Sequence, residues 1–312
     1  MKKQITMFLA VAMAAGMMAG CSGGKAQTNA SGTAAVSDTA AAETTQADTT
    51  TDATEPASSD AAAQGQTGEN TGEPDRAELE PAEILVAAAA SLKNAYEDEL
   101  IPMFQEQNPG VTVVGTYDSS GKLQTQIEEG LEADVFMSAA PKQMNALDEE
   151  GLIESGTITD LLENKIVLIV PAGNESGLAG FEDIEKAKSI ALGDPASVPV
   201  GQYSEEALTN LGIWDKIQDK VSFGTNVTEV LNQVAASSAD AGIVYATDAY
   251  SMADQVKIVA EAPEGSLKNK VLYPVAVVKN TEHEPQARAF VEFLKTDEAM
   301  AVFEKYGFSR AN

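Results

Sequence analysis

The chain has 312 residues, 44% of them hydrophobic and 22% charged, which is enough apolar material for one large domain or two lobes. Its 48 Asp and Glu residues against 20 Lys and Arg residues give a formal net charge of −28, which makes nucleic acid and a bare anionic membrane surface poor partners. The single cysteine excludes intramolecular disulfides and cysteine-clustered metal sites, and the single histidine, His283, excludes a multi-histidine metal centre.

Residues 1–20 have the features of a lipoprotein signal peptide. A basic start at Lys2 and Lys3 precedes an apolar run that is too short to span a bilayer comfortably. The following Met-Ala-Gly-Cys segment, residues 18–21, resembles the lipobox of bacterial lipoproteins. The resemblance implies cleavage before Cys21 and lipidation of its thiol, with several acyl chains anchoring the protein extracytoplasmically to the cell membrane. The alternatives are that Cys21 is discarded with the signal peptide or is a stray thiol.

Residues 21–81 are expected to form a disordered tether. Between residues 22 and 80 there are 11 acidic and two basic residues, and Val36 is almost the only apolar residue larger than alanine until the last few positions. Such a segment cannot bury enough surface to offset its conformational entropy. As a flexible coil of roughly 60 residues it would hold the next domain about 45 Å from the anchor. A partner-binding motif within the tether is the functional alternative.

Residues 82–312 alternate between strand and helix patterns. Strands are predicted at 83–88, 111–114, 133–138, 165–170, 189–192, 242–245, 257–259 and 271–278. Helices are predicted at 92–106, 122–129, 205–211, 227–236 and 284–295. Strands separated by segments of helix length predict an α/β fold with parallel sheets of the doubly wound class, and no internal repeat is convincing.

Three predicted helix starts carry capping residues directly after or near a strand. They are Ala90-Ser91-Leu92, Ser119-Ser120-Gly121-Lys122 and Thr225-Asn226-Val227-Thr228. A helix N-terminus has unpaired N–H groups and a partial positive charge, so it can hold an anion. Each one alone is explained by ordinary capping. Together, at the carboxyl ends of strands in an open α/β fold, they predict an anion site.

Several motifs, in order along residues 83–308, are similar to those of the substrate-binding proteins of ABC-type molybdate transporters. The motifs are Ala87–Leu92, Ser119–Gly121, Ala133–Ala139, Gly193–Gly201, Gly242–Tyr245, Tyr273–Val278 and Tyr306–Phe308. The resemblance implies a two-lobed periplasmic-binding-protein-like fold of type II, each lobe a doubly wound, mostly parallel sheet, with a hinge and an interlobe cleft. Lobe 1 would comprise about 82–167 and 272–312, and lobe 2 about 168–271.

The same resemblance implies a function. The chain would be the extracytoplasmic solute-binding component of an ABC importer, not an enzyme. It would capture molybdate, and tungstate as well, and deliver it to permease transmembrane subunits that work with a cytoplasmic ATPase. No cofactor and no metal apart from the molybdenum of the oxyanion are expected, and the domain is expected to be monomeric.

Matching the family's oxyanion contacts motif by motif implies five ligand residues. Ser91 and Ser120 would supply hydroxyl and N–H groups, and Tyr245 its phenol. Val200 and Val227 would supply only backbone N–H groups, which explains how apolar residues can be ligands. The alternative interpretations are that Tyr245 belongs to the core and that Val200 is an ordinary loop residue after a proline.

Asp118, before the serine pair, departs from the small uncharged residue expected in this family. We expect its carboxylate to turn outward or cap the following helix. If it pointed into the pocket instead, it would repel a dianion and accept a proton from a protonated phosphate or arsenate.

Three different functions would also suit parts of this sequence. The first is binding of sulfate or phosphate, which are tetrahedral oxyanions too. The second is hydrolysis outside the cytoplasm by paired carboxylates, for which the acidic composition supplies many candidates. The third is a lipoprotein that binds a partner and no small molecule.

Overall fold

The computed structural model describes residues 79–173 and 177–312. The predicted signal peptide, the predicted lipidation at Cys21 and almost all of the predicted tether lie outside the described residues. Within the described part of the chain, no helix has the length and apolar character needed to cross a membrane.

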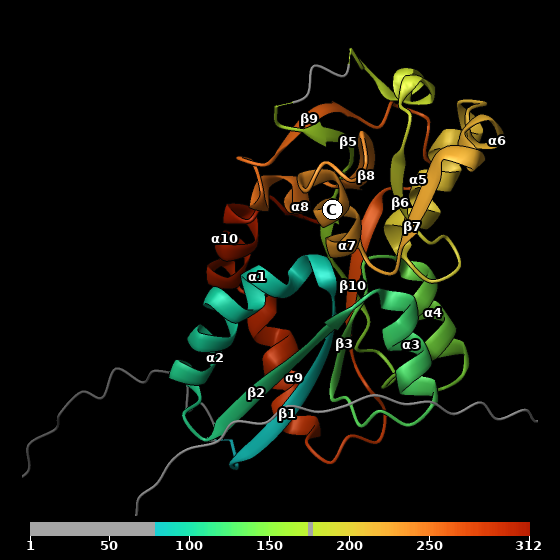
Figure 1. Cartoon of the computed structure of the whole chain (residues 1–312). Coiled ribbons are helices and arrows are strands. Elements are labelled where there is room, and N and C mark those ends of the chain that lie inside the picture. Colours follow the sequence, from blue (N-terminus) through green and yellow to red (C-terminus); the bar gives the residue numbers. More distant parts are fainter. Residues whose placement is uncertain (1–78, 174–176) are drawn as a thin grey trace, which may run out of the picture. The chain divides into compact units, whose positions relative to one another are not determined.

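The first sheet has six strands in the order β11-β4-β10-β3-β1-β2 and forms the core of lobe 1. Its strands are β1 Ala82–Ala89, β2 Val111–Asp118, β3 Val135–Met137, β4 Thr159–Asn164, β10 Val271–Val277 and β11 Ser309–Arg310. β1 pairs in parallel with both β2 and β3, whereas β10 runs antiparallel to β3 and β4. Figure 1 shows this sheet in the lower half of the view.

The second sheet has five strands in the order β7-β6-β8-β5-β9 and forms the core of lobe 2. Its strands are β5 Ile166–Pro171, β6 Ile190–Gly193, β7 Val221–Gly224, β8 Ala241–Tyr245 and β9 Val256–Glu261. β6 pairs in parallel with β7 and β8, whereas β5 runs antiparallel to β8 and β9. The chain therefore passes between the sheets twice, at Lys165 and through residues 262–270.

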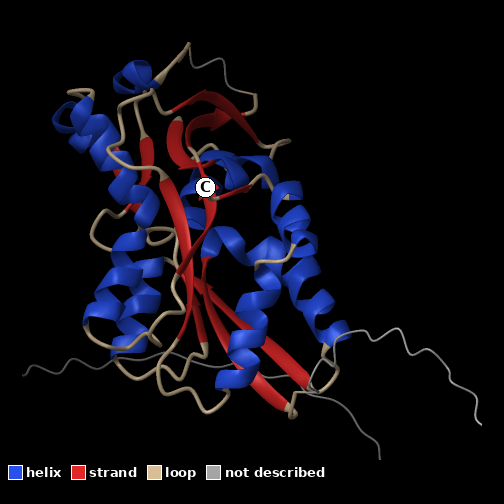
Figure 2. Cartoon of the chain, turned by 180° about the vertical axis from the view of Figure 1, so that it is seen from behind, coloured by secondary structure: helices blue, strands red, loops and turns tan. Residues whose placement is uncertain are grey.

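Helices cover both sheets (Figure 2). Lobe 1 has a continuous helical run over residues 90–107 with a π segment at Tyr96–Leu100, and then α3 Ser120–Glu128, α4 Pro141–Glu149, α9 Glu284–Leu294 and α10 Asp297–Lys305. Lobe 2 has α5 Pro199–Asn210, α6 Trp214–Ile217, α7 Val227–Ala235 and α8 Ala246–Ser251. The π segment precedes Pro102, whose missing N–H and bulky ring disfavour regular α-helical bonding to the turn before it.

Apolar side chains fill the space between sheets and helices. In lobe 1 the fully buried Tyr96 ring lies about 6 Å from the rings of Phe290 and Phe303, and Phe104 packs edge-on against Phe290 at 5.0 Å. In lobe 2, β5 is buried at every position, as expected for a strand covered on both faces. These two rigid cores hold the loops at the strand ends where the lobes meet.

Every predicted strand and helix is present, but the predicted pairing was wrong in one respect. We expected mostly parallel sheets, and only four of the nine strand pairs between the described strands are parallel. The antiparallel pairs involve β4, β5, β9 and β10, the strands next to the two crossings. No helix lies between β4 and β5 or between β9 and β10, so neither crossing is the helical crossover of a parallel βαβ unit.

Candidate functional site

All five predicted site residues line one small cavity between the lobes. Lobe 1 contributes Ser91 and Ser120, and lobe 2 contributes Val200, Val227 and Tyr245. The other residues that line this cavity are Ala89, Ala90, Asp118, Ser119, Ala139, Val198 and Pro199. The fold thus brings together residues from six separate segments of the chain, most of them at the carboxyl ends of strands.

Three helix N-termini face this cavity. Ser120 and Val227 are the first residues of α3 and α7, and Val200 is the second residue of α5. The N–H groups in the first turn of a helix have no partner within that helix, and the helix dipole adds partial positive charge there. Ser91 differs, because it lies in a short 3₁₀ segment, Ala90–Leu92, that opens the longer helical run.

The hydroxyl groups of the site already accept hydrogen bonds or point at an acceptor. The Ala139 N–H donates to Ser120 Oγ at 2.9 Å, so the Ser120 proton remains free to donate. The Tyr245 hydroxyl donates to the Ala139 carbonyl across a long 3.4 Å contact. Burial raises the pKa of Tyr245 well above its ordinary value, which keeps this phenol a neutral donor at physiological pH.

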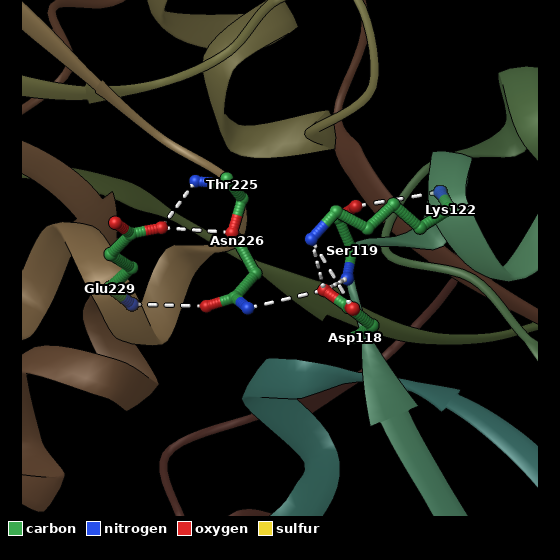
Figure 3. Close-up of polar contacts among 6 residues, drawn as sticks. All are labelled: Asp118, Ser119, Lys122, Thr225, Asn226 and Glu229. Carbon is green, nitrogen blue, oxygen red and sulfur yellow. Dashed lines mark hydrogen bonds and ion pairs between the residues drawn. The ribbon is translucent and has the colours of Figure 1, made fainter. Parts of the chain in front are cut away.

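Asp118 is the only charged residue among those that line the cavity, and neighbouring donors from both lobes bond to its carboxylate (Figure 3). Its Oδ1 accepts from the Ser119 N–H at 2.7 Å and from Lys122 Nζ at 3.2 Å. The side-chain N-cap of α3 is Ser119, so the expected capping by Asp118 is wrong in that detail. Asp118 lines the cavity and also forms an ion pair with Lys122, so its expected orientation away from the pocket stays a prediction.

Asp118 also bonds across the junction of the lobes. Asn226 Nδ2 in lobe 2 donates to Asp118 Oδ1 at 3.1 Å, while Asn226 Oδ1 caps α7 by accepting from the Glu229 N–H at 3.0 Å. Figure 3 shows the two side chains meeting between the starts of α3 and α7. A half-exposed polar contact of this kind is weak by itself, but it adds to the other contacts that hold the lobes together.

Gly121 and Ser197 bring the backbones of the two lobes into direct contact. The Gly121 N–H donates to the Ser197 carbonyl at 3.0 Å. A Cβ atom at position 121 would lie 2.3 Å from that carbonyl oxygen and 2.8 Å from Ser197 Cα. Only glycine allows the backbones to come this close, so the motif's glycine serves the contact between lobes as well as the helix start.

The sequence did not point to the residues behind the site. Tyr273 Oη lies 3.0 Å from Ser91 Oγ, and Asn164 Nδ2 donates to the same Tyr273 oxygen at 3.2 Å. Asn164 ends a strand, β4, that was not predicted. Asp248 follows the motif that contains Tyr245, and the backbone N–H groups of Tyr245 and of Asp248 itself donate to its buried carboxylate.

Asp248→Asn should change how stability depends on pH. Burial raises the pKa of Asp248 to about 7, and its Oδ2 has no hydrogen-bond partner among the described residues. An unfolded aspartate titrates near pH 3.9, so between about pH 4 and pH 7 the folded protein binds the additional proton. The free energy of unfolding therefore falls as pH rises through this window, by about 1.4 kcal/mol for each unit of pKa shift.

Asparagine can still accept the Tyr245 N–H bond but cannot ionise. We expect Asp248→Asn to raise Tm relative to wild type at pH 8 more than at pH 5, measured by thermal unfolding at both values. An equal Tm difference at the two pH values would show that the folded Asp248 has an ordinary pKa.

Comparisons with known proteins agree with this architecture. Residues 84–309 match the family model described as "Bacterial extracellular solute-binding protein". The chain is 42% identical to "Putative ABC transporter substrate-binding lipoprotein YvgL" of Bacillus subtilis, over 72% of this chain and 86% of that one. It is also 42% identical to "Molybdate-binding protein ModA" of Haemophilus influenzae, over 73% of this chain and 90% of that one.

A solved structure is similar as well. The Azotobacter vinelandii periplasmic molybdate-binding protein superposes with a TM-score of 0.65 at 25% identity, covering 73% of this chain and all of that one. The similarity spans the whole of the neighbour, so it includes both lobes and the junction between them.

Proposed function

Since this chain belongs to the bacterial extracellular solute-binding proteins, and among them to the group of molybdate-binding ABC transporter proteins, we propose that it captures molybdate outside the cytoplasm for an ABC importer. We propose further that it takes tungstate, and that it delivers either anion to permease transmembrane subunits driven by a cytoplasmic ATPase. Ser91, Ser120, Val200, Val227 and Tyr245 are the proposed ligand residues.

One observation carries the proposal: these five residues, which can offer N–H and O–H donors, meet in a single cavity, and its one carboxylate, Asp118, already accepts from the Ser119 N–H, Lys122 and Asn226. Neutral N–H and O–H dipoles can replace the hydration shell of a fully ionised tetrahedral oxyanion without a countercharge. A protonated anion would place a donor against donors, at a cost of about 1–3 kcal/mol. Sulfate has the same charge as molybdate but is smaller, so the size of the cavity has to discriminate between them.

The chemistry of the site does not suit a hydrolase. Asp118 is the one carboxylate among the lining residues, whereas hydrolysis by paired carboxylates needs two that flank the scissile bond. Among the described residues, no group of three or more His, Cys, Asp and Glu side chains is placed to hold a metal ion. The chain is a solute-binding protein and not an enzyme, in keeping with its family.

A thermal-shift assay tests the proposed ligand class. A ligand that binds only the folded state stabilises it by RT ln(1 + [L]/Kd), or about 2.7 kcal/mol at a hundred times Kd. Molybdate and tungstate should therefore raise Tm by several degrees, whereas equal concentrations of phosphate should leave it nearly unchanged. Shifts with phosphate larger than those with molybdate would contradict the proposal.

We propose that Cys21 carries the lipid anchor, an assignment supported by the lipobox-like segment before it. Cys21→Ser should release the protein from membranes because the acyl chains lose their attachment atom, while the domain at residues 82–312 stays folded. Fractionation of cells expressing each form measures this, with thermal unfolding of the released protein as the folding control. Membrane retention equal to wild type would contradict lipidation as the anchor.

A further inference from the structure

A chain of hydrogen bonds connects Ser91 to three buried residues that do not line the cavity. It joins Ser91 Oγ to Tyr273 Oη at 3.0 Å, Tyr273 Oη to Asn164 Nδ2 at 3.2 Å, and Asn164 Nδ2 to Thr247 Oγ1 at 3.0 Å. Tyr273, Asn164 and Thr247 are all at most 5% exposed. These hydrogen bonds lie where β4 passes into β5, so they link lobe 1 with the start of α8 in lobe 2.

The side chain of Asn164 determines which atoms donate and which accept in these hydrogen bonds. Asn164 Oδ1 accepts from the Lys165 backbone N–H at 2.8 Å. The amide nitrogen of Asn164 therefore faces Tyr273 and Thr247, and an amide NH₂ group only donates. Tyr273 Oη thus accepts from Asn164, and its own proton needs an acceptor elsewhere.

Ser91 Oγ lies 3.0 Å from Tyr273 Oη and can accept that proton. The Tyr245 ring packs edge-on against Tyr273 with centroids 5.5 Å apart, and the Tyr245 hydroxyl donates to the Ala139 carbonyl while its oxygen can still accept from Tyr273; of these two acceptors we assign the Tyr273 proton to Ser91 Oγ. Burial raises the pKa of Tyr273 well above its ordinary value, so the phenol keeps its proton at neutral pH. With Tyr273 donating to Ser91, the Ser91 proton is directed to the cavity.

We propose that Tyr273 and Asn164 are positioning residues that lock the Ser91 hydroxyl as a donor toward the bound oxyanion and so set the preference for a fully ionised anion. This inference rests on the proposed function and adds the groups that determine its specificity. The Ser120 hydroxyl is oriented in the same way by the Ala139 N–H, a backbone group that can only donate. The Ser91 hydroxyl is instead oriented by the side chains of Tyr273 and Asn164, so a mutation can remove this constraint.

Removing the hydrogen bond from Tyr273 to Ser91 has two expected effects on anion binding. In Tyr273→Phe the Ser91 hydroxyl loses its donor and can rotate, so its proton no longer has to face the cavity. Molybdate, which only accepts hydrogen bonds, loses a preoriented donor. A hydrogen phosphate ion, which carries a proton, gains an oxygen that can accept it. The ratio of molybdate to phosphate affinity should therefore fall.

The test is a double-mutant cycle of Tyr273→Phe and Ser91→Ala, with molybdate affinity measured by calorimetry at neutral pH and phosphate affinity by competition. We expect Tyr273→Phe alone to weaken molybdate binding about 3- to 10-fold, the range that one net hydrogen bond gives. In the Ser91→Ala background the same change should have little further effect, because its action passes through the missing hydroxyl.

The matched control is Tyr96→Phe. Tyr96 is a fully buried tyrosine of the same lobe whose hydroxyl bonds to Met137 Sδ at 2.9 Å, and neither residue lines the cavity. It should keep the wild-type affinity and the wild-type ratio. Asn164→Ala is a second variant for the case in which Tyr273→Phe folds poorly. It removes the amide donor and keeps the Tyr273 hydroxyl, and we expect the same fall in the ratio of molybdate to phosphate affinity.

The outcomes separate the two claims. If wild type binds molybdate but the losses of molybdate affinity from Tyr273→Phe and Ser91→Ala simply add, Tyr273 has only a structural role. The inference is then overturned, whereas the proposed function stands. An unchanged molybdate-to-phosphate ratio in both Tyr273→Phe and Asn164→Ala overturns it as well. If wild type binds no molybdate at all, the proposed function fails and the inference fails with it.

Discussion

Gly121→Ala is expected to weaken molybdate binding about 10- to 100-fold while each lobe stays folded. The added Cβ would meet backbone atoms of Ser197 at 2.3 and 2.8 Å, and neither partner is a flexible side chain that can move aside. Overpacking costs about 1–3 kcal/mol, and separating the lobes at this point relieves it. Because the proposed ligand residues come from both lobes, separation removes part of the donor set at once.

Two measurements identify this mechanism. Calorimetry should show the loss of affinity, and small-angle scattering with saturating molybdate should show a more expanded variant than wild type. The control is Gly173→Ala, at a glycine where an added Cβ meets nothing within 4 Å; it should behave as wild type in both measurements. Wild-type affinity in Gly121→Ala would mean that the contact with Ser197 is not part of the ligand-bound state.

Ser120→Ala should have the second large effect, a loss of molybdate affinity of about 1–3 kcal/mol. Ser120 is fully buried, and its oxygen is the only partner found for the Ala139 N–H among the described residues. Replacement by alanine removes one donor to the anion and leaves a buried N–H unpaired. The backbone N–H of residue 120, at the start of α3, remains in place.

Val200→Ala separates the two kinds of donor. The proposed contact of Val200 is its backbone N–H, which alanine retains, so molybdate affinity should change much less than in Ser120→Ala. Val200 is fully buried, so the truncation lowers stability, and Tm has to be measured beside affinity. A larger loss of affinity in Val200→Ala than in Ser120→Ala would reverse the roles assigned to these residues.

The five predicted site residues share one kind of local setting in the sequence. Ser91, Ser120, Val200, Val227 and Tyr245 each stand in a short motif at the end of a strand or the start of a helix. The resemblance to molybdate-binding proteins assigned these residues, and the fold places all five around one cavity. Whether they bind the anion is the subject of the mutations proposed above.

The features that the sequence did not predict depend on how the lobes meet. No local pattern indicates that Asn226 reaches Asp118, that Gly121 packs on Ser197, or that Tyr273 stands behind Ser91. The antiparallel pairing was missed for a related reason: β4 is short and carries Asp, Glu and Asn among its six residues, so its pattern is not that of a typical buried strand. Without β4, the crossing at Lys165 and the Asn164 side chain could not be placed.

The central claim is that the N–H and O–H donors of the five proposed ligand residues select a fully ionised tetrahedral oxyanion of the size of molybdate. Calorimetric titration of the domain at neutral pH with molybdate, tungstate, sulfate and phosphate tests it most directly. The account predicts one-to-one binding with molybdate and tungstate far tighter than sulfate and phosphate. Tighter binding of phosphate than of molybdate, or no binding of molybdate, would contradict it.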